Sequence, residues 1–174
     1  MTEEPVPTGN PSPHSPSDAF RLEAEASLRI EHWRDGEHRT LTGLEALHHA
    51  VGESSARHWV DLTDPSPALV EAVADELGLH PLIAEDILER NQRPKLDAYD
   101  DYLFIVLHFP VFDKTQDRLL TAELDLFVGP DFLITLPDQN LPPLSAMFER
   151  YRARQEVSEA IFSKGTGYLL YKIV

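Results

Sequence analysis

The chain has no cysteine, which excludes disulfides, thiol nucleophiles and cysteine-ligated zinc sites. Basic residues are also scarce: 15 Lys and Arg stand against 30 Asp and Glu, and the net charge of -15 repels nucleic acids and anionic membrane surfaces. No apolar run approaches the roughly 20 residues of a membrane-spanning helix, and the N-terminus lacks the features of a signal peptide. These absences predict a soluble cytoplasmic protein whose partners include divalent cations and exclude nucleic acid.

Prolines are concentrated at the N-terminus, where residues 1–19 contain almost no large apolar side chains. Such a segment cannot bury enough apolar surface to offset the entropy lost on ordering, so the sequence predicts a disordered, proline-rich leader there. The chain as a whole is 42% hydrophobic and 26% charged, which is typical of a globular protein. Residues 20–174 therefore have the size and composition of one domain.

The first half of this domain mixes strand-like and helix-like patterns. The predicted elements are, in order, a strand over 24–33, a hairpin turn at Asp35-Gly36, a strand over 39–41, a helix over 44–51, a strand over 58–62 and a helix over 68–77. Asp61 and Asp64 bracket the turn before the last of these helices, and we expect them to act as capping residues.

The second half is rich in strands and then returns to helices. The predicted elements are strands over 103–111, 119–128 and 132–135, followed by helices over 144–156 and 168–174. The three strands predict an antiparallel meander, and the nearly continuous apolar character of 103–111 predicts a strand that is covered on both faces. Asp97, Asp100 and Asp101 are expected in a polar turn before it. The last helix has no stop signal, so we expect the natural chain to continue beyond Val174.

The segment from Gly78 to Lys95 is the most informative part of the chain. Gly78 can adopt the left-handed conformation that ends a helix, and Pro81 suits the first position of the next one. Pro94 pushes the residue before it into an extended conformation, so the new helix must end by about Arg90.

On this short helix the apolar and acidic residues separate by spacing. Ile83, Ala84, Ile87 and Leu88 fall on one side, and Glu85, Asp86 and Glu89 fall on the other. Carboxylate oxygens suit hard cations such as Mg²⁺, but two or three of them on one helix form only part of a coordination shell. Spacing alone leaves two interpretations open: a solvated acidic surface, or part of a metal site formed with another surface.

The eight histidines do not have the spacing of metal ligands. His48 and His49 are adjacent and would point in different directions on a helix. His80 is expected to help start the helix at Pro81, and His108 is expected to pack in or on a sheet. The sequence also lacks a glycine-rich phosphate loop and the nucleophile and zinc motifs of hydrolases.

Several short motifs, in this order and spacing, resemble the CorA family of divalent cation transporters. They are Trp59-Val-Asp-Leu, Leu77-Gly-Leu-His-Pro-Leu, Glu85-Asp-Ile-Leu, Gln92-Arg-Pro-Lys95, Tyr102-Leu-Phe-Ile-Val and Gly167-Tyr-Leu-Leu-Tyr171. The resemblance runs from about His58 to Val174. It implies that residues 20–174 are an N-terminal cytoplasmic domain of the α/β class, a three-layer α-β-α sandwich around a mixed parallel and antiparallel sheet.

The resemblance further implies a homopentameric transporter for Mg²⁺, with Co²⁺ as a related ion. The membrane would be reached only through C-terminal helices that lie outside this chain. In that family regulatory cations bind between neighbouring protomers, and Glu85 and Asp86 stand at the matching positions. Three alternatives remain: a related zinc transporter, an assembly module without a sensing role, and a metal-dependent enzyme that uses Glu85, Asp86 and an aspartate of residues 97–101.

Overall fold

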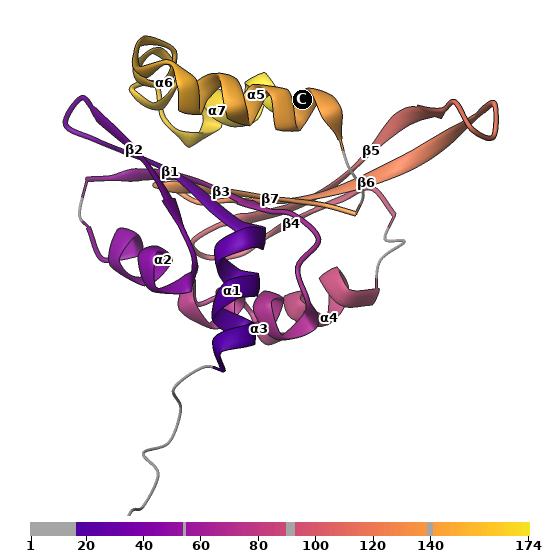
Figure 1. Ribbon diagram of the computed structural model, residues 1–174, viewed down its shortest axis with the longest axis horizontal. Helices are drawn as coiled ribbons and strands as arrows, with labels where there is room; N and C mark the ends of the chain where they lie inside the picture. Colours follow the sequence, from indigo (N-terminus) through magenta and orange to yellow (C-terminus); the bar gives the residue numbers. More distant parts are fainter. Residues whose placement is uncertain (1–16, 54, 90–92, 139–140) are drawn as a thin grey trace, which may run out of the picture.

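The computed structural model describes residues 17–53, 55–89, 93–138 and 141–174. Over these residues the chain forms a seven-stranded sheet that lies between two layers of helices (Figure 1). The strands are β1 (Leu28–Arg34), β2 (Glu37–Thr42), β3 (Arg57–Leu62), β4 (Lys95–Ala98), β5 (Leu103–Asp113), β6 (Arg118–Val128) and β7 (Phe132–Pro137). The helices are α1 (Asp18–Ser27), α2 (Leu44–Val51), α3 (Pro67–Glu76), α4 (Pro81–Glu89), α5 (Pro142–Ala153), α6 (Gln155–Phe162) and α7 (Thr166–Ile173).

The sheet consists of two antiparallel halves that are joined by one parallel pair of strands. Its order is β2-β1-β3-β7-β6-β5-β4, and the β3–β7 pair alone is parallel. Residues His58 to Asp61 of β3 pair with Phe132 to Thr135 of β7. We call these paired residues the β3–β7 seam. The predicted meander of β5, β6 and β7 is confirmed, as is the mixed character of the sheet.

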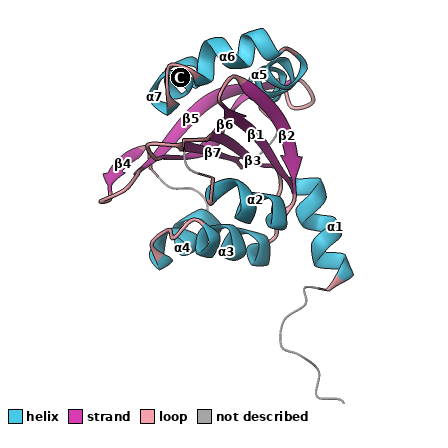
Figure 2. Ribbon diagram, turned by 90° about the vertical axis from the view of Figure 1, so that its left-hand side faces the viewer, coloured by secondary structure: helices cyan, strands magenta, loops and turns pink. Residues whose placement is uncertain are grey.

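Helices cover both faces of the sheet, and each face has its own hydrophobic core. Helices α1 to α4 lie on one face and α5 to α7 on the other (Figure 2). Side chains alternate between the two cores along a strand: Val60 and Leu62 of β3 belong to the core under α1 to α4, whereas Trp59 belongs to the core under α5 to α7. The predicted three-layer α-β-α sandwich is confirmed.

The predicted strand over 24–33 is correct only from Leu28 onward. Residues 24–27 belong to α1, whose start is capped by the Ser17 hydroxyl accepting from the Phe20 amide. Apolar and polar residues alternate here, but burial follows the helical period: Phe20 and Ala24 face the core, whereas Arg21, Leu22 and Glu25 are exposed. Helix α1 thus begins at Asp18, inside the predicted leader; residues 1–16 of that leader lie outside the described residues.

The predicted helix over 144–156 is two helices. Arg154 takes extended backbone angles and separates α5 from α6. The buried Ser158 hydroxyl donates a 2.6 Å hydrogen bond to the Tyr151 carbonyl, which satisfies an acceptor at the end of α5. A tertiary contact of this kind leaves no mark in the apolar spacing, and so the break was not predicted.

Strand β4 was also not predicted, because its sequence Lys-Leu-Asp-Ala has little strand propensity. It forms by pairing with β5, and it places Asp97 in a strand instead of the predicted polar turn, where Asp100 and Asp101 do lie.

The prediction that 103–111 is covered on both faces is wrong beyond Val106. Leu107, Phe109 and Val111 still pack against the core under α5 to α7, whereas the alternate residues His108, Pro110 and Phe112 are exposed. At their far end β5 and β6 extend as a two-stranded arm (Figure 1).

Candidate functional site

Helix α4, which carries the predicted site residues, is held firmly at its start. Gly78, with a φ of 61°, ends the preceding helix, and Pro81 begins α4 as predicted. The amide of His80 donates to the Tyr102 hydroxyl at 3.0 Å, and the Leu82 amide donates to His80 Nδ1 at 3.3 Å. The predicted role of His80 at the helix start is therefore confirmed.

The inner side of α4 anchors it to the sheet. Ile83 and Ile87 are buried in the core under α1 to α4, and Ala84 packs against the same core. Leu88 was predicted on this apolar side but is 38% exposed. The two isoleucines fix the rotation of the helix, and through it the direction in which the acidic residues project.

The predicted acids of α4 do not share one environment. Glu85 and Glu89 are exposed, whereas Asp86 is half-buried. Asp86 Oδ2 accepts a 2.6 Å hydrogen bond from Lys95 Nζ at the start of β4. The same ammonium lies 3.2 Å from Asp97 Oδ2, so that it stands between carboxylates from two elements. The expectation of three acids on one exposed face holds for Glu85 and Glu89 but not for Asp86.

The contacts of Lys95 fix its charge. The hydrogen bond from the ammonium to Asp86 raises the pKa of Lys95; burial opposes this, and the bond to Asp97 adds to it. The ammonium also lies 5.0 Å from the centroid of the Phe104 ring, within range of a cation–π contact. Lys95 is therefore a charged counter-ion whose one positive charge is shared by two carboxylates, those of Asp86 and Asp97.

The donor chemistry of α4 fits a hard cation, but the number of donors in this chain does not complete a site. Glu85 and Asp86 offer carboxylate oxygens, the ligands that Mg²⁺ prefers. Among the described residues no group of three or more His, Asp or Glu side chains is placed to hold a metal ion. Asp97 approaches Asp86, yet the Lys95 ammonium lies between them. Any cation bound at Glu85 and Asp86 needs further ligands from water or from a second chain.

The histidines of the described region have structural partners. His32 and His58 lie side by side on β1 and β3, with tilted rings whose centroids are 4.9 Å apart, and both are buried. Burial lowers the pKa of both side chains, that of His58 to about 4. His108, predicted to pack in or on a sheet, lies on β5 with its Nε2 3.6 Å from Glu123 Oε2.

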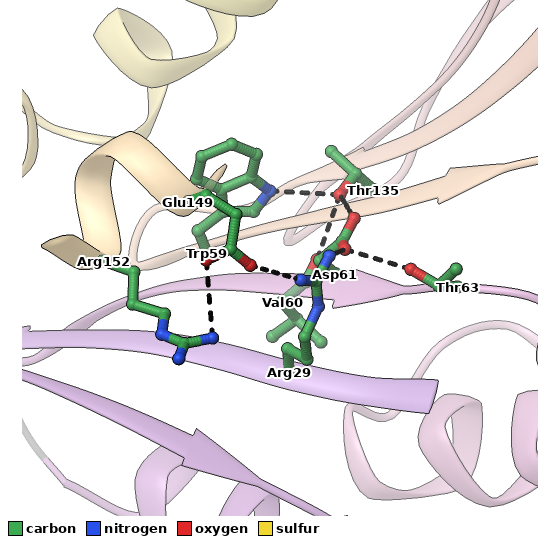
Figure 3. A network of polar contacts seen from close by, with 8 residues as sticks. All are labelled: Arg29, Trp59, Val60, Asp61, Thr63, Thr135, Glu149 and Arg152. Atoms are coloured by element: carbon green, nitrogen blue, oxygen red, sulfur yellow. Dashed lines mark hydrogen bonds and ion pairs between the residues drawn. The ribbon is translucent and has the colours of Figure 1, made fainter. Parts of the chain in front are cut away.

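A buried polar network on the β3–β7 seam was not recognised in the sequence (Figure 3). Asp61 accepts hydrogen bonds from Arg29 at 2.5 Å, Thr135 at 2.7 Å and Thr63 at 3.2 Å. The indole of Trp59 donates to the Thr135 hydroxyl at 3.1 Å. Asp61 had been interpreted as a capping residue, but Ser66 caps α3 instead. The alternation of Trp59 and Asp61 along a buried strand was the available signal, because it places both side chains on one face.

The network also ties the outer helical layer to the sheet. Arg29 of β1 reaches from Asp61 to Glu149 of α5 at 2.8 Å, and its guanidinium lies 4.5 Å from the centroid of the Phe148 ring. Glu149 is in turn 3.5 Å from Arg152 on the same helix. The network is structural in character: its acceptors are occupied by donors of this chain, so it offers no open position for a ligand.

Comparison with known proteins decides the family. The family model described as "CorA-like Mg2+ transporter protein" matches residues 54–173. The chain belongs to this CorA-like family. The predicted resemblance to CorA transporters is thus confirmed over the region where the motifs lie, including α4 and its acids.

Individual relatives agree with this assignment. The chain is 35% identical over 119 residues to the putative metal ion transporter YfjQ of Bacillus subtilis, covering 68% of this chain and 35% of that protein. It is 29% identical over 124 residues to the cobalt/magnesium transport protein CorA of Thermotoga maritima, covering 70% and 34%. The chain thus spans about a third of the length of these curated relatives.

The fold is that of solved CorA structures. The CorA magnesium transporter of Methanocaldococcus jannaschii matches with a TM-score of 0.63 at 16% identity, over 83% of this chain and 42% of that one. The soluble domain of the same CorA matches with a TM-score of 0.60 at 17% identity, over 82% and 52%. Within the described parts of the present chain, no helix has both the length and the apolar character needed to cross a bilayer.

Proposed function

We propose that this CorA-like chain is the cytoplasmic sensing domain of a divalent cation transporter, and that Glu85 and Asp86 supply part of a regulatory Mg²⁺ site. The observation that carries the proposal is the pair of adjacent carboxylates on a helix whose inner face is fixed in the core by Ile83 and Ile87. The membership of a transporter family supports transport over enzymatic chemistry.

The incomplete donor set leads to the second part of the proposal. Because the described residues hold no complete metal site, the remaining ligands come from a neighbouring copy in a homo-oligomer, a pentamer in the assembled transporter at the cytoplasmic face of the membrane. A site with few charged ligands and several waters is weak, with a dissociation constant on the order of 10⁻³ M. That range suits a sensor of a cation as abundant as Mg²⁺. Co²⁺ binds both oxygen and nitrogen ligands, so we expect it to bind the same carboxylates.

The mechanism follows from charge. Each chain carries a net charge of -15, so copies that assemble side by side repel one another. A Mg²⁺ ion that bridges carboxylates of two copies replaces this repulsion by attraction and favours a closed arrangement. When the ion leaves, the repulsion returns, loosens the interface and favours conduction. The cation thus shifts a two-state equilibrium through its different affinity for the two states.

The first test is a Mg²⁺ titration of the chain, followed through backbone amide resonances. We expect shifts centred on residues 83–88, and we expect the double variant Glu85→Gln/Asp86→Asn to lose them. The matched control is Glu71→Gln/Asp75→Asn, which removes two exposed charges from the neighbouring helix α3. The proposal is wrong if the α4 variant keeps the Mg²⁺-dependent shifts or if the α3 variant loses them instead.

A second measurement separates a sensor from an assembly module without sensing. Analytical ultracentrifugation should show that Mg²⁺ raises the average mass of the chain, and that the α4 double variant removes this dependence on Mg²⁺. Association that is equally strong with and without Mg²⁺ would support the assembly module.

A further inference from the structure

Lys95 lies beside Asp86 of α4, one of the two carboxylates proposed to bind a cation. Its ammonium is held by three contacts from three elements: Asp86 of α4 at 2.6 Å, Asp97 of β4 at 3.2 Å and the Phe104 ring of β5 at 5.0 Å. The side chain is 29% exposed, so water and ions can reach the pair. The ammonium is thus a cation already present at Asp86, attached to the chain and aimed at one of the two predicted ligands.

Because the Lys95 ammonium has three contacts, it can move away from Asp86 and still keep two of them. If Asp86 turned toward another cation, Asp97 and Phe104 would still hold Lys95, and no carboxylate would lose all of its counter-charge. The lysine therefore has two accessible arrangements: one shared between Asp86 and Asp97, and one on Asp97 alone.

Charge decides which free cations can replace it. K⁺ and Na⁺ carry the same single charge as the ammonium, but the ammonium is tethered and acts at a high effective concentration. A divalent ion interacts about twice as strongly with Asp86 and gains further attraction from the carboxylate of Glu85, the next residue on α4, which is exposed. Exchange is therefore favourable for a divalent ion and unfavourable for a monovalent one.

We infer that Lys95 is a tethered counter-ion that a divalent cation must displace from Asp86, and that it thereby raises the cation concentration at which the site fills and excludes monovalent cations. This inference rests on the proposed Mg²⁺ site. It assigns to Lys95 control of affinity and selectivity, in addition to its structural contact between β4 and α4.

The test compares three variants in Mg²⁺ titrations followed at the Glu85 and Asp86 amides. Lys95→Met should tighten Mg²⁺ binding about fivefold, the equivalent of ~1 kcal/mol for a partly exposed ion pair. Lys114→Met removes the same charge from the exposed turn between β5 and β6 and should leave the affinity unchanged, whereas Lys95→Arg should keep it near the original value. Equal affinities for Lys95→Met and Lys114→Met would overturn the inference.

Selectivity provides a readout that a purely structural lysine would not affect. When K⁺ replaces tetramethylammonium at constant ionic strength, the apparent Mg²⁺ affinity of the unmodified chain should stay constant, and that of Lys95→Met should fall. If K⁺ weakens Mg²⁺ binding equally in both proteins, Lys95 does not exclude monovalent cations.

A measurement on the unmodified chain keeps the inference testable if Lys95→Met does not fold. The Lys95 side-chain resonances should shift with the same Mg²⁺ midpoint as the Asp86 amide. An Asp86 response without a Lys95 response would overturn the counter-ion role while leaving the Mg²⁺ site intact. No Mg²⁺ response at either residue would instead overturn the proposed site itself.

Discussion

Replacement of Asp61 by alanine is expected to lower the free energy of unfolding by about 3–5 kcal/mol. The carboxylate is buried at 3% exposure and accepts from Arg29, Thr63 and Thr135. Its loss leaves Glu149 as the carboxylate partner of the Arg29 guanidinium and removes an acceptor from the buried Thr135 hydroxyl. Urea denaturation followed by tryptophan fluorescence measures the change, because Trp59 belongs to the same network.

The control for this prediction is Asp75→Ala, which removes an exposed carboxylate from α3 and should change the stability by less than about 0.5 kcal/mol. A double-mutant cycle with Thr135→Val separates the bond between Asp61 and Thr135 from the other contacts. If Asp61→Ala lowers the free energy of unfolding by no more than the control does, the network on the β3–β7 seam does not stabilise the fold.

Acidification should destabilise the chain by about 3 kcal/mol through His58 alone between pH 6.5 and pH 4. Burial, followed by the neighbouring His32, lowers the pKa of His58 from 6.5 to about 4. In this window the unfolded chain binds a proton at His58 and the folded chain does not. The contribution of His58 to stability is therefore complete above pH 6.5 and is lost as the pH falls toward 4. His32, whose pKa is lowered chiefly by burial, acts in the same direction.

The measurement is a set of urea denaturation curves across this pH range for the unmodified chain and for His58→Gln. The difference in slope between the two proteins isolates His58 from the carboxylates that also titrate below pH 5. His49→Gln, at an exposed position of α2, serves as the control and should keep the original pH dependence. An unchanged slope in His58→Gln would refute the assignment.

The sequence was a good guide where the local pattern and the tertiary environment agree. Helix α2 was predicted with its observed bounds, and α4 was predicted to within one residue because Pro81 and Pro94 limit it on both sides. The prediction of a strand over residues 24–27 was wrong because the alternation of alanine with polar residues fits both a strand and one turn of a helix. Strand β4 could not be predicted, because it exists through its pairing with β5 and not through its own composition.

The candidate site, too, was predictable from local sequence patterns only in part. Sequence spacing placed Glu85 and Asp86 side by side on one helix, and family resemblance gave them a role that remains a prediction. What neither could supply was the partner of Asp86. Lys95 meets Asp86 only because β4 joins the edge of the sheet and brings residue 95 back over α4. Long-range pairings of this kind depend on the whole fold, and a single sequence does not state them.

The β3–β7 seam has a consequence for how the chain folds. Each antiparallel half of the sheet is built from strands that are close in sequence, whereas the bond from Thr135 to Asp61 joins residues 74 positions apart. Closing so long a loop costs entropy that hairpins avoid. We therefore expect the two halves to assemble first and the seam to close last. Thr135→Val, which removes hydrogen bonds across the seam to Trp59 and Asp61, would then accelerate unfolding and leave the refolding rate almost unchanged, and slower refolding would show that the seam forms early.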